Sequence, residues 1–201
     1  MQINAIFTIG VGVDKLLECV KPARKVFAKN ENGFITSILC PNMRTSLKSF
    51  DMPPDVTHKE SAELDKIKDA IKIKALDFLK TCGYKTEQYK CELSNIWLNE
   101  MHSHSYHKAH YHYGPNISGC FYVDVPKDSG PIVFSHSALN VDTLNIIEID
   151  NYNQLNSSTW SFIPEEGDVY FWKSDLLHEV PQTNFEGIRR SIAFDISIFR
   201  R

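Results

Sequence analysis

Histidine is concentrated in one short segment of this chain, where residues 102–112 hold five of the eight histidines in the sequence. His110 and His112 are two positions apart, and a β-strand places such positions on the same face. Imidazole is a ligand for iron, zinc, copper and nickel, but two ligands do not complete a metal site. His178 is the only histidine beyond residue 136, so we predict that a distant strand brings it to the other two.

An arginine and a hydroxyl group follow this candidate site. Arg189 lies eleven residues beyond His178, and it would share one face of a strand with Ser191. Residues 180–188 contain a proline, an asparagine and a glycine, which predicts a turn and a hairpin that pairs the strand of Arg189 with the strand ending at His178. A guanidinium fork beside a hydroxyl is suited to binding a carboxylate.

Helices are expected before residue 90. The clearest covers residues 58–82, where one apolar stripe has helical spacing: Leu64, Ile67, Ile71, Ala75 and Phe78. Thr57 and Glu60 have the spacing of a capping box, and a glycine follows the last turn. A second helix is predicted over residues 14–30, with a break or restart at Pro22. Each helix has one apolar side, so we expect both to cover one face of a sheet.

Beyond residue 90 the apolar pattern changes to a period of two. In residues 117–125 the odd positions are mostly apolar, and they alternate with Ser118, Cys120, Tyr122 and Asp124. Further short strands are predicted between turns, at Ile132–Ser135, Trp160–Ile163, Val169–Trp172 and Ser191–Phe199. Such an arrangement is typical of a jelly roll or related barrel. The predicted fold class is therefore mainly β (α+β), with N-terminal helices packed on one face.

Composition and charge limit the class of protein. The 201 residues suffice for one domain, 1–201, in which 1–90 supports a β core at 91–201. Apolar residues make up 42% and the net charge is −3, which predicts neither nucleic-acid nor membrane binding. Residues 1–13 lack the features of a signal peptide and are predicted as a first strand. Five cysteines without C-x-x-C spacing favour reduced thiols and a cytoplasmic location.

The order of these motifs resembles a known family, the Fe(II)/2-oxoglutarate-dependent dioxygenases. In that family H-x-(D or H) is followed by a distal histidine and then by R-x-S about ten residues later. The likeness is greatest to a group of short 2OG-Fe(II) oxygenases and covers about residues 95–199. Its phrases here are His110-Tyr-His112, Ser118-Gly-Cys-Phe-Tyr122-Val, Gly130-Pro-Ile-Val-Phe134, Pro164-Glu-Glu-Gly167-Asp and Arg189-Arg-Ser-Ile-Ala-Phe194-Asp-Ile.

The resemblance implies a double-stranded β-helix with Fe(II) and 2-oxoglutarate as cofactors. The implied metal ligands are His110, His112 and His178. The distal carboxylate of 2-oxoglutarate would bind Arg189, helped by Ser191, and Tyr122 is a further candidate contact. O2 and an organic or peptidyl substrate would be converted into a hydroxylated product with release of succinate and CO2. No catalytic side chain is implied beyond the metal ligands.

One position departs from the usual family pattern of two histidines and one carboxylate. His112 occupies the place of the aspartate, so three neutral ligands would leave the iron one unit more positive. In a second interpretation only His110 and His178 bind, and another ligand fills the third place. Asp175 and Asp195 are carboxylates that could do so, although neither has the family spacing.

Other residues and other functions stay open at this point. His107 is the best candidate for a substrate contact, and Arg190 should alternate onto the apolar face and reach solvent at an edge. Substrate selectivity is expected in the loops 99–109 and 136–158. The alternatives to a dioxygenase are a cupin-like metal protein that does not use 2-oxoglutarate and an inactive jelly-roll binding or structural protein.

Overall fold

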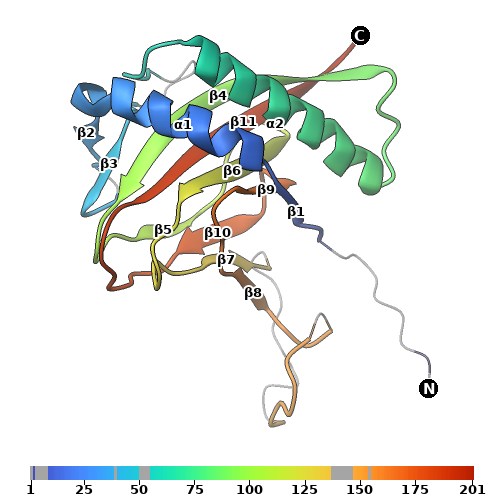
Figure 1. Ribbon diagram of the computed structural model, residues 1–201. Helices are drawn as coiled ribbons and strands as arrows, with labels where there is room; N and C mark the ends of the chain where they lie inside the picture. Colours follow the sequence, from blue (N-terminus) through green and yellow to red (C-terminus); the bar gives the residue numbers. More distant parts are fainter. Residues whose placement is uncertain (1, 3–8, 39, 50–54, 137–146, 154) are drawn as a thin grey trace.

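The chain forms two antiparallel sheets with two helices on one side, as Figure 1 shows. The computed structural model describes residues 2, 9–38, 40–49, 55–136, 147–153 and 155–201. Within the predicted loop 136–158, residues 137–146 and 154 lie outside the described part of the chain, and so do residues 1 and 3–8 of the predicted first strand. Within the described part of the chain, no helix is both long enough and apolar enough to cross a membrane.

The larger sheet has seven strands in the order β1-β9-β6-β11-β4-β3-β2, and the smaller has four in the order β5-β10-β7-β8. The strand bounds are β1 Gly12–Lys15, β2 Ile35–Thr36, β3 Met43–Thr45, β4 Tyr89–Met101, β5 His107–His110, β6 Ile117–Asp124, β7 Ile132–Ser135, β8 Thr159–Phe162, β9 Asp168–Lys173, β10 Leu177–Val180 and β11 Arg189–Arg200. Two facing sheets of this kind are a double-stranded β-helix. This confirms the predicted fold class, and among the described residues no strand pairing joins the two sheets into a closed barrel.

The helices cover the outer face of the larger sheet, as predicted. Helix α2, Ala62–Thr81, buries its stripe at Leu64, Ile67, Ile71, Ala75 and Leu79. Its N-cap is Ser61, whose Oγ accepts a hydrogen bond from the Leu64 backbone, so the capping box predicted at Thr57 was wrong. Helix α1, Leu17–Lys29, runs through Pro22 without a break. A short 3-10 helix, Glu31–Gly33, follows it.

Alternation along β6 and β11 gives the larger sheet two different faces. Apolar side chains of both strands, among them Phe121 and Phe194, pack toward the helices in the main core. Gly119 is required there, because a Cβ atom would lie 2.2 Å from the Phe194 ring. The opposite face looks toward the smaller sheet and carries a second, aromatic cluster with Tyr122 and Trp172. The same face also carries buried polar side chains of β11: Arg189, Ser191 and Asp195.

Candidate metal centre

The three histidines singled out by the sequence lie together between the sheets. Strand β10 pairs with β5 so that His178 lies directly opposite His110. His112 lies just beyond the end of β5, where its backbone N–H donates to the carbonyl of Ser174 at 2.9 Å. One possible ligand atom from each ring lies within 4.8 Å of the others. The ring centroids are 4.2 Å apart for His110 and His178, and 5.2 Å apart for each pair that includes His112.

Hydrogen bonds fix which nitrogen each ring presents. Nδ1 of His110 donates to the carbonyl of Lys108 at 2.8 Å, and Nδ1 of His178 donates to the carbonyl of Leu176 at 2.9 Å. Nδ1 of His112 donates to a carboxylate oxygen of Asp195 at 2.6 Å. A ring that uses Nδ1–H as a donor leaves the Nε2 lone pair for a metal. The three rings thus have the tautomer that ligation through Nε2 requires.

The electrostatics of the cluster also suit a metal ion. Burial lowers the pKa of His178 to about 2 and the pKa of His107 to about 3, and burial lowers the pKa of His110 as well. Neutral imidazole is the form that binds metals, so these rings are ready to coordinate without first losing a proton. Three imidazole nitrogens in a partly enclosed site fit a divalent first-row metal such as Fe(II).

Asp195 completes the surroundings of His112. It lies on β11 opposite Asn95 of β4 and Ser118 of β6, and both side chains donate hydrogen bonds to it. Burial raises the pKa of Asp195, but the bonds from His112, Ser118 and Asn95 outweigh that effect and lower the pKa overall. Asp195 thus lies behind His112, and Asp175 is exposed and outside the cluster. The geometry therefore favours the three-histidine interpretation over a carboxylate ligand.

Arg189 is the largest fully buried side chain of the described residues, with 1% of its surface exposed. Its Nη1 donates to the carbonyls of Ser129 and Gly130, at 2.9 and 3.1 Å, and its Nη2 donates to the Tyr122 hydroxyl at 3.1 Å. Its Nε has no hydrogen-bond partner. No carboxylate of the described residues pairs with it in the structure. A guanidinium buried among neutral groups leaves a positive charge that an anion can satisfy.

Tyr122 and Ser191 lie beside this guanidinium. The two residues are direct partners in the β6–β11 register, and both are buried. Burial raises the pKa of Tyr122 well above its usual range, so the hydroxyl accepts from Arg189 and keeps its own proton to donate. Between Arg189 and Asp195 the inward positions of β11 hold only Ser191 and Ala193. Both of these side chains are small.

Several site predictions need correction. The predicted hairpin between the strands of His178 and Arg189 does not form, because β10 belongs to the smaller sheet and β11 to the larger. Arg190 was expected to be an ordinary arginine reaching solvent at an edge. Instead it bridges two acidic residues on the flanking strands, at 2.9 Å to Glu100 and 3.2 Å to Asp124. His107 packs against His110 with ring centroids 4.0 Å apart, while His104 is exposed.

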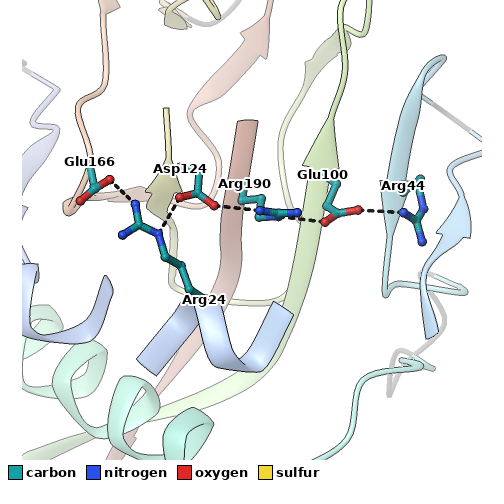
Figure 2. A network of polar contacts seen from close by, with 6 residues as sticks. All are labelled: Arg24, Arg44, Glu100, Asp124, Glu166 and Arg190. Atoms are coloured by element: carbon teal, nitrogen blue, oxygen red, sulfur yellow. Dashed lines mark hydrogen bonds and ion pairs between the residues drawn. The ribbon is translucent and has the colours of Figure 1, made fainter. Parts of the chain in front are cut away.

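Figure 2 shows the charged chain to which Arg190 belongs. Arg24 of α1 pairs with Asp124 and Glu166, and Arg44 of β3 pairs with Glu100. This network ties α1 to four neighbouring strands, β6, β11, β4 and β3, on the helix side of the sheet. No local pattern in the sequence predicts this network, because its partners are up to 142 residues apart along the chain.

A cleft of about 720 Å3 opens beside His112. It runs between the segment that ends α2 and the loop after β5, and tyrosines contribute much of its lining: Tyr84, Tyr89, Tyr111 and Tyr113. The hydroxyls of Tyr111 and Tyr113 hydrogen-bond to each other. An apolar cleft next to a candidate metal ligand is a suitable place for an organic molecule.

Comparisons with known proteins agree with this geometry. A family model described as "Putative 2OG-Fe(II) oxygenase" matches residues 95–195, which include all three histidines, Arg189 and Asp195. A comparison with curated proteins finds no match. Among similar solved structures is a prolyl-4-hydroxylase from Pseudomonas putida, with a TM-score of 0.61 and 11% identity over 96% of this chain and 94% of that one.

Two further structures share the fold and contain relevant ligands. A viral collagen prolyl hydroxylase from Paramecium Bursaria Chlorella virus-1, in complex with 2OG, has a TM-score of 0.55 and 15% identity, covering 92% of this chain and 94% of that one. HygX from Streptomyces hygroscopicus, with nickel and 2-oxoglutarate bound, has a TM-score of 0.57 and 13% identity, covering 94% and 83%. At these identities the likeness to solved structures shows the fold alone. The family is shown by the match to the family model. By the match to the family model, the chain belongs to the 2OG-Fe(II) oxygenases, whose cofactors are Fe(II) and 2-oxoglutarate.

Proposed function

We propose that this protein is a hydroxylase that couples 2-oxoglutarate to the oxidation of an organic or peptidyl substrate, with succinate and CO2 as co-products. The observation that carries the proposal is Arg189, a buried guanidinium with no carboxylate partner in the described structure, on the strand that also approaches the histidines. A cupin-like metal protein or an inert jelly roll has no use for such a charge. A dicarboxylate cofactor satisfies it.

Each group of site residues has a separate role in this proposal. His110, His112 and His178 would hold Fe(II) through Nε2 and leave positions on the metal open. Arg189 would bind the distal carboxylate of 2-oxoglutarate, with Tyr122 and Ser191 donating from their hydroxyls. When bound, iron and 2-oxoglutarate together supply the oxidising chemistry that activates O2. The protein orients these partners and keeps water from the buried end of the cofactor.

The organic substrate would lie in the cleft beside His112, on the side lined by Tyr111 and Tyr113. His107, which packs on His110, would border the reacting end of the substrate. A bulky substitution such as Asn116→Trp in the cleft should reduce oxidation of a substrate more than it reduces Fe(II) binding.

The test is succinate formation from 2-oxoglutarate by the purified protein with Fe(II) and O2, with His178→Ala as the matched control. We expect succinate only when the metal and the intact cluster are both present, because the cofactor must be held by the metal. A protein that binds Fe(II) tightly but never consumes 2-oxoglutarate would support the cupin-like alternative. A protein that binds no Fe(II) would support the non-enzymatic one.

A further inference from the structure

The three histidines differ in what lies behind them. His110 and His178 donate from Nδ1 to backbone carbonyls, which are neutral acceptors. His112 donates to the carboxylate of Asp195, at a shorter distance of 2.6 Å. His112 is also the residue that occupies the place of the usual carboxylate ligand. The one charged acceptor of the cluster therefore lies behind the one ligand whose type departs from the family pattern.

Asp195 is built into this position. Only 4% of its surface is exposed, at the centre of the seven-stranded sheet. Its neighbours on both adjacent strands donate to it, Ser118 Oγ at 2.7 Å and Asn95 Nδ2 at 3.0 Å. No lysine or arginine in the described part of the chain pairs with it, and His112 is its one basic contact there. These hydrogen bonds favour the charged form of the carboxylate, and a metal on His112 would add a nearby positive charge that stabilises it further.

We infer that Asp195 is a positioning residue that supplies, through His112, the negative charge that a carboxylate ligand would otherwise supply directly. The inference rests on the proposed three-histidine metal centre. The hydrogen bond to Asp195 fixes the His112 ring with Nε2 toward the cluster, and it makes the ring a stronger donor. The net charge of the metal and its surroundings is then the same as with two histidines and one aspartate, with the carboxylate one ring farther away.

The direct test is the Fe(II) affinity of Asp195→Asn, measured by calorimetry without O2. The amide keeps the shape of the carboxylate, and it can still accept from His112. Asn95 can adapt, because its buried Oδ1 has no partner and becomes an acceptor when the side-chain amide rotates. Loss of such a partner typically lowers metal affinity by about 10- to 100-fold, and we expect a loss in that range. The Co(II)-substituted protein should also show a changed visible spectrum.

The matched control is Asp168→Asn. Asp168 is a buried aspartate of the same sheet, 6% exposed, but it accepts from Lys15 and the Glu165 backbone and contacts no histidine. We expect this change to leave the Fe(II) affinity and the Co(II) spectrum unaltered. An equal loss of affinity in both variants would mean that any buried aspartate supports the fold, and the role given to Asp195 would be overturned.

A second experiment distinguishes an electrostatic role of Asp195 from a purely structural one. In His112→Asp the new carboxylate would lie against Asp195, and two adjacent carboxylates repel each other. Adding Asp195→Asn should then raise the Fe(II) affinity, although the same change lowers it when His112 is present. A purely structural Asp195 would lower the affinity in both backgrounds, and that result would overturn the inference. If the wild-type protein bound no Fe(II), the metal centre itself would fail. If it bound Fe(II) and Asp195→Asn bound it equally well, only this inference would fail.

Discussion

Arg189 and Arg190 are adjacent in sequence but lie on opposite faces of β11 in unlike surroundings. The Arg189 side chain is fully buried and donates only to neutral oxygens. The Arg190 side chain is 33% exposed and bridges two carboxylates. A strand alternates its side chains, so one position along the chain changes the environment completely. Arg189 is therefore available to bind a ligand, whereas Arg190 forms ion pairs that stabilise the fold.

The same division holds for the rest of the sheet. The face toward the helices is mostly apolar and carries the line of ion pairs drawn in Figure 2. The charged side chains of that line are paired with one another, so this face needs no ligand. The face toward the smaller sheet carries the guanidinium of Arg189, the carboxylate of Asp195 and small side chains, while the histidines come from the smaller sheet and the residue just after β5. Its polar groups become satisfied when a metal and a dicarboxylate are present. Changes on the inner face should therefore affect ligands, and changes on the outer face should affect stability.

The largest effect is expected from His178→Ala on the inner face. Removing one of three ligands should abolish most Fe(II) binding, where the wild-type protein should bind about one Fe(II) per chain. Metal analysis after gel filtration measures this directly. His104→Ala, at an exposed histidine of the same segment, should retain full binding. Full metal occupancy in His178→Ala would show that the metal lies elsewhere.

Arg189→Ala should raise the 2-oxoglutarate concentration required for half-maximal succinate release by roughly thirty-fold or more. Truncating a buried charged partner costs on the order of 2–5 kcal/mol, and each 1.4 kcal/mol is about tenfold. Arg189→Lys should recover only part of the loss, since a point charge lacks the planar fork. Fe(II) binding should persist in both variants. If Arg189→Ala left the concentration dependence unchanged, the inner face would have no role in holding the cofactor.

The metal-free protein should lose stability as the pH falls. Burial lowers the pKa of His178 to about 2 and of His107 to about 3, from an ordinary value of 6.5 that applies to the unfolded chain. Below about pH 6.5 the unfolded chain therefore binds more protons than the folded one. The free energy of unfolding should fall by up to about 1.4 kcal/mol per pH unit for each such group. Urea titrations between pH 7 and 4.5 measure the slope, and His107→Phe should make it shallower.

The smallest change is expected from Arg190→Met on the outer face. Glu100 is buried and would lose one of its two arginine partners, but Arg44 still pairs with it. We expect a loss of about 1–2 kcal/mol in the free energy of unfolding, and no change in 2-oxoglutarate dependence. Arg24→Met, at a more exposed arginine of the same network, should cost less. Thermal unfolding of both variants measures which one loses more stability. Weaker binding of 2-oxoglutarate by Arg190→Met would contradict the assignment of Arg190 to the outer face.

Much of the fold followed from local patterns in the sequence. The period of two located β6 and β7, and the apolar stripe located α2. The stripe could not identify the cap, because Thr57 and Ser61 both precede acidic residues and only the folded chain selects one. Pro22 lies in the sixth position of α1, where losing one hydrogen bond did not end the helix.

Long-range pairing was the part that the sequence could not provide. Turn residues at 181–187 predicted a turn, but not that the chain would cross from the smaller sheet to the larger one. The contact of His112 with Asp195 joins residues 83 positions apart, and it depends on the register of β11 against β6. The motif order placed the histidines and Arg189 in one site without that register. The charged surroundings of His112 and Arg190 are set by this long-range pairing and are visible only in the folded structure.

The most direct test of the role of Arg189 changes the ligand instead of the protein alone. 2-Oxobutyrate keeps the end of 2-oxoglutarate that binds a metal but lacks the distal carboxylate. Calorimetry without O2 on the Fe(II)-loaded protein should show a preference for 2-oxoglutarate of roughly thirty-fold or more. Arg189→Ala should reduce that preference to near unity, and Arg190→Met should keep it. A preference that survives in Arg189→Ala, or disappears in Arg190→Met, would contradict the division of β11 into a ligand face and a stability face.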